Sequence, residues 1–276
     1  MKLRWVFVLL ALNLASAAEI TIPDACDDNI CVTGLRWKKG TVEHTLTGFV
    51  APKQGQIDSV EIVFSYADPK HHGDFRVRLK DVQARTPFYF KLFGGGLLQT
   101  GKFDWSQSSV RVEATAIVSV ASQQKNGISC SFRSLGSRLK ASIKNASDKD
   151  AVLEYGLLSL TSGGESVRLN GTHGKYADLG TPNPSTLVPS GASVTEEFIP
   201  FGSATFTNGE WVEDWQMHRA LSRPGATLAL PLTVDGHQTI EKIPLDVVVG
   251  SVTTEGSHEA VTLGSAVPNT VPTPCI

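Results

Sequence analysis

Short alternating runs of apolar and polar residues, separated by tight turns, constrain the fold of this chain more than any other feature. Residues 60–66 read VEIVFSY, residues 75–79 read FRVRL and residues 110–113 read VRVE. A period of two, in segments rich in β-branched and aromatic residues, is what a strand with one buried face needs. Turn dipeptides such as Asn208-Gly209 and Asp235-Gly236 recur between the runs. The pattern predicts an all-β fold.

The spacing of these strands and turns predicts two immunoglobulin-like β-sandwich domains with a flexible C-terminal tail. The first domain is expected over residues 19–122 and begins with a cysteine loop. After a polar boundary, the second domain is expected over residues 128–249. The tail, residues 250–276, is rich in Ser, Thr and Pro, a composition that buries too little apolar surface to offset the entropy of ordering.

The first 18 residues read as a secretory signal peptide. Lys2 and Arg4 precede the short apolar run 5–14, and Ala15-Ser16-Ala17 fits a cleavage site. The apolar run is short for a bilayer span, and no later segment of the sequence approaches the roughly 18 apolar residues that a membrane helix needs. We therefore expect a secreted or periplasmic protein without a transmembrane anchor.

Four cysteines, Cys26, Cys31, Cys130 and Cys275, follow the signal peptide. An even number in an oxidising compartment predicts two disulfides, for which three pairings exist. We favour Cys26 with Cys31, because a short polar loop closes easily, and Cys130 with Cys275. A zinc site is not expected, because the spacing is not that of a two-residue knuckle and no paired histidines follow.

The first predicted domain resembles the FxLYD-type immunoglobulin-like modules of exported bacterial proteins. The resemblance rests on residues 45–50, TLTGFV, and residues 59–68, SVEIVFSYAD. Phe64 and Asp68 match the name-giving pattern, while residues 66–67 depart from its Leu and Tyr. The resemblance implies an extracytoplasmic binding or spacer module, and it brings no catalytic residues with it.

Charge and motif content argue against several classes of partner and cofactor. The formal net charge is −2, so the chain lacks the basic excess that neutralises a nucleic-acid backbone. Residues 96–102 match most of a phosphate-binding loop, but Phe103 stands where magnesium binding needs Ser or Thr. His71 and His72 would face opposite ways on a strand, so we interpret the tip around them as a hairpin turn rather than a metal site. No cofactor, metal site or catalytic residue is predicted.

A binding surface is predicted in the second domain. Trp211 follows a tight turn, Trp215 is four residues further along, and His173 and Tyr176 lie in the long irregular segment 170–193. The acidic residues expected to rim this surface are Glu210, Glu213 and Asp214. The alternative is that both tryptophans fill the core and contact no partner.

We therefore predict an exported, non-enzymatic protein with a binding, adhesive or assembly role and a protein or glycan partner. The alternative is an exported hydrolase, with glycans as one candidate substrate class and its site in the long second-domain loop. The sequence leaves open the partner, the host, the oligomeric state, the disulfide pairing and the glycosylation of the sequons at Asn145 and Asn170.

Overall fold

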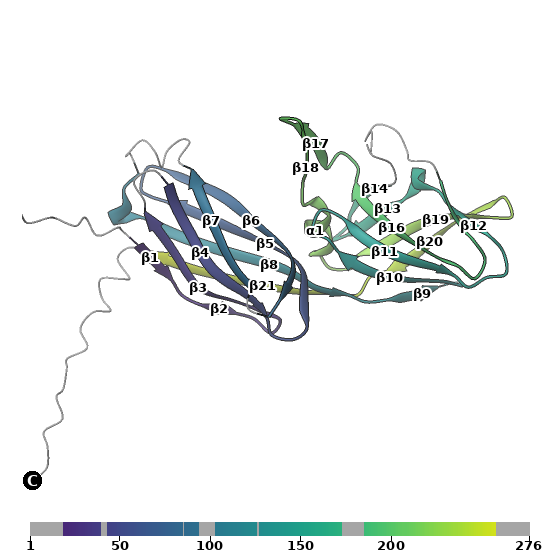
Figure 1. Cartoon of the computed structure of the whole chain (residues 1–276), viewed down its shortest axis with the longest axis horizontal. Coiled ribbons are helices and arrows are strands. Elements are labelled where there is room, and N and C mark those ends of the chain that lie inside the picture. The colour runs from purple at the N-terminus through teal and green to yellow at the C-terminus, as the bar shows by residue number, and fades with distance from the viewer. Residues whose placement is uncertain are drawn as a thin grey trace, which may run out of the picture.

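The structure, a computed structural model, describes residues 19–39, 43–84, 86–93, 103–125, 127–172 and 185–257 (Figure 1). The prediction of an all-β fold is confirmed: the described chain is mainly antiparallel strands, with one short helix, α1 (Gln216–Leu221). The division into two domains and their immunoglobulin-like type stay predictions. The expected signal peptide lies outside the described residues.

Two sheets pack face to face to form what we call the N-terminal sandwich (Figure 1). The strands of one sheet, in spatial order, are β1 (Glu19–Ile22), β3 (Ile30–Lys39), β4 (Glu43–Pro52) and β7 (Thr86–Phe93), with β2 (Ala25–Cys26) paired to β3. Those of the other sheet are β21 (Val247–Ser257), β8 (Ser109–Val120), β5 (Gln56–Ala67) and β6 (His72–Gln83).

The inward half of the alternating pattern fills the space between these sheets. Ile62 and Phe64 of β5 are fully buried, and Trp37 of β3 meets Phe64 edge to face with ring centroids 5.2 Å apart. Fully burying side chains of this kind stabilises a fold by about 1.5–3 kcal/mol each. The predicted β5–β6 hairpin is confirmed, with Phe64 opposite Phe75.

A ten-stranded sheet surrounds a second apolar cluster, which includes Leu139, Phe198 and Leu228. Its strands are β9 (Gln123–Lys125), β10 (Ile128–Ser134), β11 (Leu139–Asn145), β12 (Ala151–Leu153), β13 (Ser159–Ser162), β14 (Glu165–Gly171), β15 (Thr186–Val188), β16 (Ser193–Pro200), β19 (Thr227–Val234) and β20 (His237–Pro244). Two short 3-10 turns are Trp105–Gln107 and Tyr155–Leu157.

The chain returns to the N-terminal sandwich after building the ten-stranded sheet. Strand β21 pairs antiparallel with β8 from Val247 opposite Val120 to Ser257 opposite Ser109. The prediction of a flexible tail from residue 250 is therefore wrong for residues 250–257. Val252 is buried in the sandwich core, and Gly250 leaves room for Ile30, whose side chain would lie 2.9 Å from an added Cβ. Residues 258–276 lie outside the described residues.

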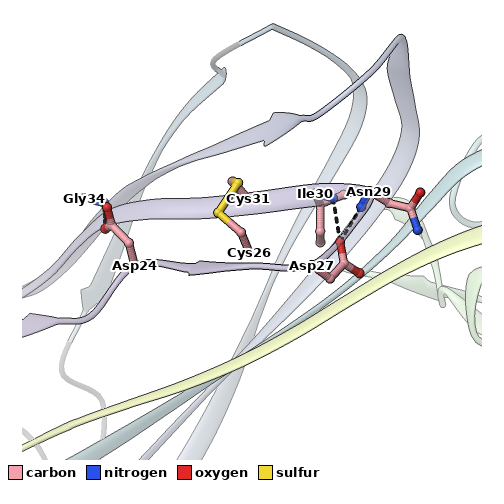
Figure 2. Close-up of a disulfide and its surroundings, with 7 residues drawn as sticks. All are labelled: Asp24, Cys26, Asp27, Asn29, Ile30, Cys31 and Gly34. Carbon is pink, nitrogen blue, oxygen red and sulfur yellow. Dashed lines mark hydrogen bonds between the residues drawn. A yellow bond between two sulfur atoms is a disulfide. The ribbon is translucent and has the colours of Figure 1, made fainter.

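The Cys26–Cys31 disulfide is confirmed, and it closes a small loop whose turn is held by Asp27 (Figure 2). The Asp27 carboxylate accepts hydrogen bonds from the backbone amides of Asn29 and Ile30, both at 2.7 Å, and from that of Ser251 at 2.6 Å. Partial burial raises the pKa of Asp27, but these amide donors outweigh it and hold the pKa below its usual value. The loop thereby fixes β21 to the start of β3.

Cys130, which is predicted to pair with Cys275, has no disulfide in the structure. Cys130 is a free thiol on β10, buried at 2% exposure within the apolar cluster of the ten-stranded sheet. Burial raises the pKa of this thiol to about 12. Cys275 lies outside the described residues.

Candidate functional site

A hairpin separate from both sheet systems is the strongest candidate for a binding site. Strands β17 (Ala204–Thr207) and β18 (Glu210–Glu213) pair only with each other in the described chain, and Figure 1 shows them projecting from the ten-stranded sheet. Asn208 and Gly209 form the turn with φ of 54° and 85°. Both positive values match the two-residue turn that Asn-Gly favours in hairpins.

Large apolar side chains on this hairpin face solvent. Phe206 is opposite Trp211 across the two strands, with ring centroids 5.5 Å apart, and their exposed fractions are 62% and 44%. Val212, on the other face, is 52% exposed. An aromatic pair gains about 0.5–1.5 kcal/mol beyond its burial, so the two rings hold each other in place while a large part of each remains accessible to a partner.

Ionic contacts fix the base of the hairpin to the rest of the molecule. Glu213 accepts hydrogen bonds from Arg138 Nε at 3.0 Å and from the Ser137 hydroxyl, and Asp214 lies 2.5 Å from Arg219 Nη2. Burial raises the pKa of Glu213, but the bonds from Arg138 and Ser137 outweigh it and lower the pKa overall. Two of the three acids expected to rim the surface, Glu213 and Asp214, are therefore paired with arginines at its base, although Asp214 stays exposed, and Glu210 is exposed on the hairpin itself.

Trp215 is a packing residue, which corrects its prediction as a binding residue. Its side chain is 5% exposed, and its ring lies 2.6 Å from the position where a Cβ on Gly136 would stand. Arg78 and Lys80 of β6 lie over the ring at 5.7 and 5.9 Å from its centroid. The indole therefore fills the junction between β6, the turn after β10 and helix α1. Only Trp211 of the two tryptophans is available to a partner.

The other two predicted binding residues, His173 and Tyr176, lie outside the described residues. The same holds for residues 96–101 and Lys102 of the glycine-rich stretch that resembles a phosphate-binding loop. Whether the long segment and the hairpin form one surface stays a prediction.

A serine and a histidine, far apart in the sequence, meet at the junction of the two sheet systems. Ser59 Oγ lies 2.9 Å from His218 Nδ1, and His218 Nε2 lies 3.0 Å from the Thr115 carbonyl oxygen. A carbonyl only accepts, so Nε2 carries the proton and Nδ1 accepts from the Ser59 hydroxyl. In turn Ser59 accepts from the Ser134 hydroxyl at 2.9 Å.

This pair has the elements of a nucleophile and a general base, but it is closed to substrate. Ser59 is 0% and His218 1% exposed, so no carbonyl group can approach the serine oxygen. Burial lowers the pKa of His218 to about 4, despite the opposing field of Glu61. The network instead connects β5, β8, β10 and α1 through satisfied hydrogen bonds.

The histidines at the tip of the β5–β6 hairpin make a local turn. Asp68 accepts from the amides of Lys70 and His71 at 2.7 and 2.6 Å, from the amide of Asp104 at 2.8 Å, and its Oδ2 lies 3.0 Å from His71 Nδ1. Desolvation raises the pKa of Asp68, but these hydrogen-bond donors outweigh it, and the pKa lies well below the usual value. His72 begins β6 instead of joining them. Within the residues that the structure describes, no group of three or more potential ligands could hold a metal ion.

Both glycosylation sequons have buried asparagines. Asn145 is 0% exposed and donates to the carbonyls of Lys149 and Val188 at 2.7 and 3.1 Å. Asn170 is 2% exposed. A glycan on either nitrogen is incompatible with this packing.

No helix in the described part of the chain is long and apolar enough to cross a membrane.

No family model matches the chain, and no curated protein matches it in sequence. A red sea bream transglutaminase is 10% identical over 77% of this chain, with a TM-score of 0.19, and the match spans 31% of the transglutaminase chain. AerE from Microcystis aeruginosa is 6% identical over 87% of this chain and 99% of its own, with a TM-score of 0.14. Likeness at these TM-scores carries no argument about fold or function.

Proposed function

We propose that this is an exported, non-catalytic binding protein that binds a protein partner through the β17–β18 hairpin. The observation that carries the proposal is the exposure of Phe206, Trp211 and Val212 on a two-stranded element that belongs to neither sheet system. Export is supported by the sequence of the signal peptide and by the Cys26–Cys31 disulfide, since disulfides persist in oxidising compartments.

The exposed apolar side chains of the hairpin favour a partner with an apolar groove. A two-stranded hairpin by itself is marginally stable in water, and this one is exposed on both faces. Covering the rings would remove apolar surface from water at about 25 cal/mol per Å². Of the side chains from Thr205 to Val212, only Glu210 is charged, so the hairpin can be desolvated at small cost.

The rival function, an exported hydrolase, receives less support. The Ser59–His218 pair is the arrangement nearest to hydrolytic machinery among the described side chains, and both members are buried. Of the loop in which such a site is expected, residues 170–193, the central residues 173–184 lie outside the described residues.

Affinity capture from the native extracytoplasmic fraction tests the proposal with three forms of the mature protein: wild type, Trp211→Ala and Leu157→Ala. Leu157 is the matched control, because it is also a large exposed apolar residue, at 52%, but lies away from the hairpin on a 3-10 turn. Removing a central aromatic anchor typically costs about 2 kcal/mol or more, roughly a 30-fold loss of affinity. We expect wild type and Leu157→Ala to retain the same partner and Trp211→Ala to lose it. Equal retention by all three forms would refute the hairpin as the binding element.

A further inference from the structure

The outward face of the sheet β1–β3–β4–β7 carries a second feature, unrelated to the hairpin. Strand alternation directs Trp37 and Leu46 into the sandwich core and leaves Arg36 and Lys38 of β3 exposed on the opposite face. The register places Arg36 opposite Thr47, and Thr47 opposite Tyr89 of β7. One row across three strands therefore runs from a guanidinium through a hydroxyl to an aromatic ring.

This face is hollowed along β4. Short threonines, Thr45 and Thr47, lie between the long side chains of β3 and the ring of Tyr89, and together they line a groove of about 460 Å³. Neighbouring strands lie about 4.8 Å apart, so the two walls stand about 10 Å apart. Tyr89 is 59% exposed and forms one wall. The groove lies along β4 between the side chains of β3 and Tyr89 of β7, a position open to an extended chain.

The charge of the groove is positive in a protein whose net charge is −2. Arg36 and Lys38 line it, as does Lys39, whose ammonium however lies over the Trp105 ring, 5.6 Å from its centroid. Among the described lining residues the one carboxylate is Glu19, 3.6 Å from Arg36. The Arg36 side chain is 64% exposed, so this pair is weak and leaves the guanidinium able to bind another anion. On one strand face, Arg36 and Lys38 stand about 7 Å apart and can contact successive anionic groups.

We propose that this groove binds an anionic polysaccharide, a chain of sugar rings that carries carboxylate or sulfate groups. The cations match the acidic groups, the threonine hydroxyls exchange hydrogen bonds with sugar hydroxyls, and Tyr89 offers a flat apolar face to the C–H side of a pyranose ring. An acidic polypeptide fits less well, because the groove has no apolar pocket among its described lining residues for the side chains of a peptide. Nucleic acid would require a larger basic surface than the few cations of this groove.

Calorimetric titration of the mature protein tests this assignment with four probes. They are a heparin-derived octasaccharide for sulfate, an oligogalacturonate of the same length for carboxylate, a neutral malto-oligosaccharide, and poly-aspartate of matched charge. We expect one or both anionic sugars to bind, the neutral sugar and poly-aspartate to bind at least about tenfold more weakly, and affinity to fall with added salt.

Substitutions in the groove test whether the anionic sugar binds there. Arg36→Gln with Lys38→Gln should weaken binding of the anionic sugar by about tenfold or more, because it removes two cations that contact the acidic groups. Tyr89→Ala should weaken it by about fivefold, because it removes the ring that contacts the sugar face. Lys140→Gln with Lys144→Gln is the matched control: it removes the same charge from exposed positions on β11 and should change affinity less than about twofold.

Thermal melting confirms that each variant is folded, and Tyr89→Ala serves as the test if the double variant is not. Three outcomes would overturn the proposal: neither anionic sugar binds, the groove and control variants lose affinity equally, or poly-aspartate binds as tightly as the sugars. The last would assign the groove to an acidic polypeptide. The test is independent of the hairpin, because Trp211 is unchanged in every form.

Discussion

Individual polar side chains decide how the N-terminal sandwich meets helix α1. Ser59, Ser134 and His218 form one buried hydrogen-bonded chain, and Arg133 beside it lies 3.3 Å from Asp58. Buried polar groups stabilise a structure only when their partners are in place. The junction is therefore sensitive to the protonation state of its one histidine.

Stability should fall as the pH drops from about 6.5 to about 4. Burial lowers the pKa of His218 from 6.5 to about 4, so the unfolded chain takes up a proton in this range and the folded chain does not. The free energy of unfolding should decrease by about 1.4 kcal/mol per pH unit, about 3 kcal/mol in all, from its full value above pH 6.5. The raised pKa of Asp58 acts in the opposite direction near the acidic end.

Urea unfolding of wild type and His218→Gln at several pH values checks this expectation. Glutamine lowers the baseline stability because it reproduces the hydrogen bonds poorly, but it removes the titrating group. The pH slope between 6.5 and 4 should be clearly shallower in the variant. Identical slopes in the two proteins would rule out His218 as their source.

Cys130 should be unreactive in the folded protein. Its thiol is buried and its pKa is raised to about 12, so the reactive thiolate is rare at pH 8. In a Cys275→Ser form we expect no rapid labelling by a thiol reagent in buffer and one labelled thiol in guanidinium chloride. Fast labelling of the folded form, or a Cys130–Cys275 peptide in a non-reducing digest of wild type, would contradict the buried free thiol.

Some of these residue contacts could be predicted from the sequence, and others could not, for physical reasons. The spacing of Cys26 and Cys31 sufficed to predict their disulfide, because a loop that short closes locally. Ser59 and His218 are 159 positions apart, and no local pattern connects them. Trp211 and Trp215 have similar sequence surroundings, yet one is exposed and the other buried, because tertiary packing against Gly136 decides which ring is covered.

At the scale of elements, the β17–β18 hairpin should be the least protected pair of strands. It is exposed on both faces and hydrogen-bonded only within itself in the described chain, whereas β5 lies between β6 and β8. Local opening of such an element requires little of the free energy of global unfolding. Hydrogen exchange by mass spectrometry should show residues 204–213 exchanging orders of magnitude faster than residues 57–66. Equal protection of the two segments would contradict the expectation that the hairpin opens locally.

Elements with a clear period of two were predicted well, and those defined by long-range pairing were not. The alternation in residues 60–66 and 75–79 predicted the β5–β6 hairpin, and Asn208-Gly209 indicated the turn of β17–β18. Strand β21 was missed, because residues 250–257 read GSVTTEGS, a composition typical of a linker. It is ordered by eleven residues of pairing with β8 and by close contact of its glycines with Ile30 and Ile22.

At the scale of the whole molecule, β21 should be indispensable. Val252 belongs to the core of the N-terminal sandwich, and the Asp27 carboxylate binds the Ser251 amide. A chain ending at Ser257 should melt within a few degrees of the full protein, because only the Ser/Thr/Pro-rich residues beyond β21 are removed. A chain ending at Asp246 should lose the cooperative melting of the sandwich and aggregate through the exposed edge of β8. Matching melting curves for the two truncated chains would refute this role of β21.

The pairing of β8 with β21 also sets an order of maturation. The two strands are neighbours in space, but the whole ten-stranded sheet is synthesised between them. At about 10 residues per second, roughly ten seconds separate the translation of β8 from that of β21. The part of the protein that is made first is thus completed last, and newly made β8 waits with an open edge until its partner arrives. A factor that shields this edge during synthesis or export would raise the yield of the folded protein, whereas one that acts after β21 has emerged would come too late to do so.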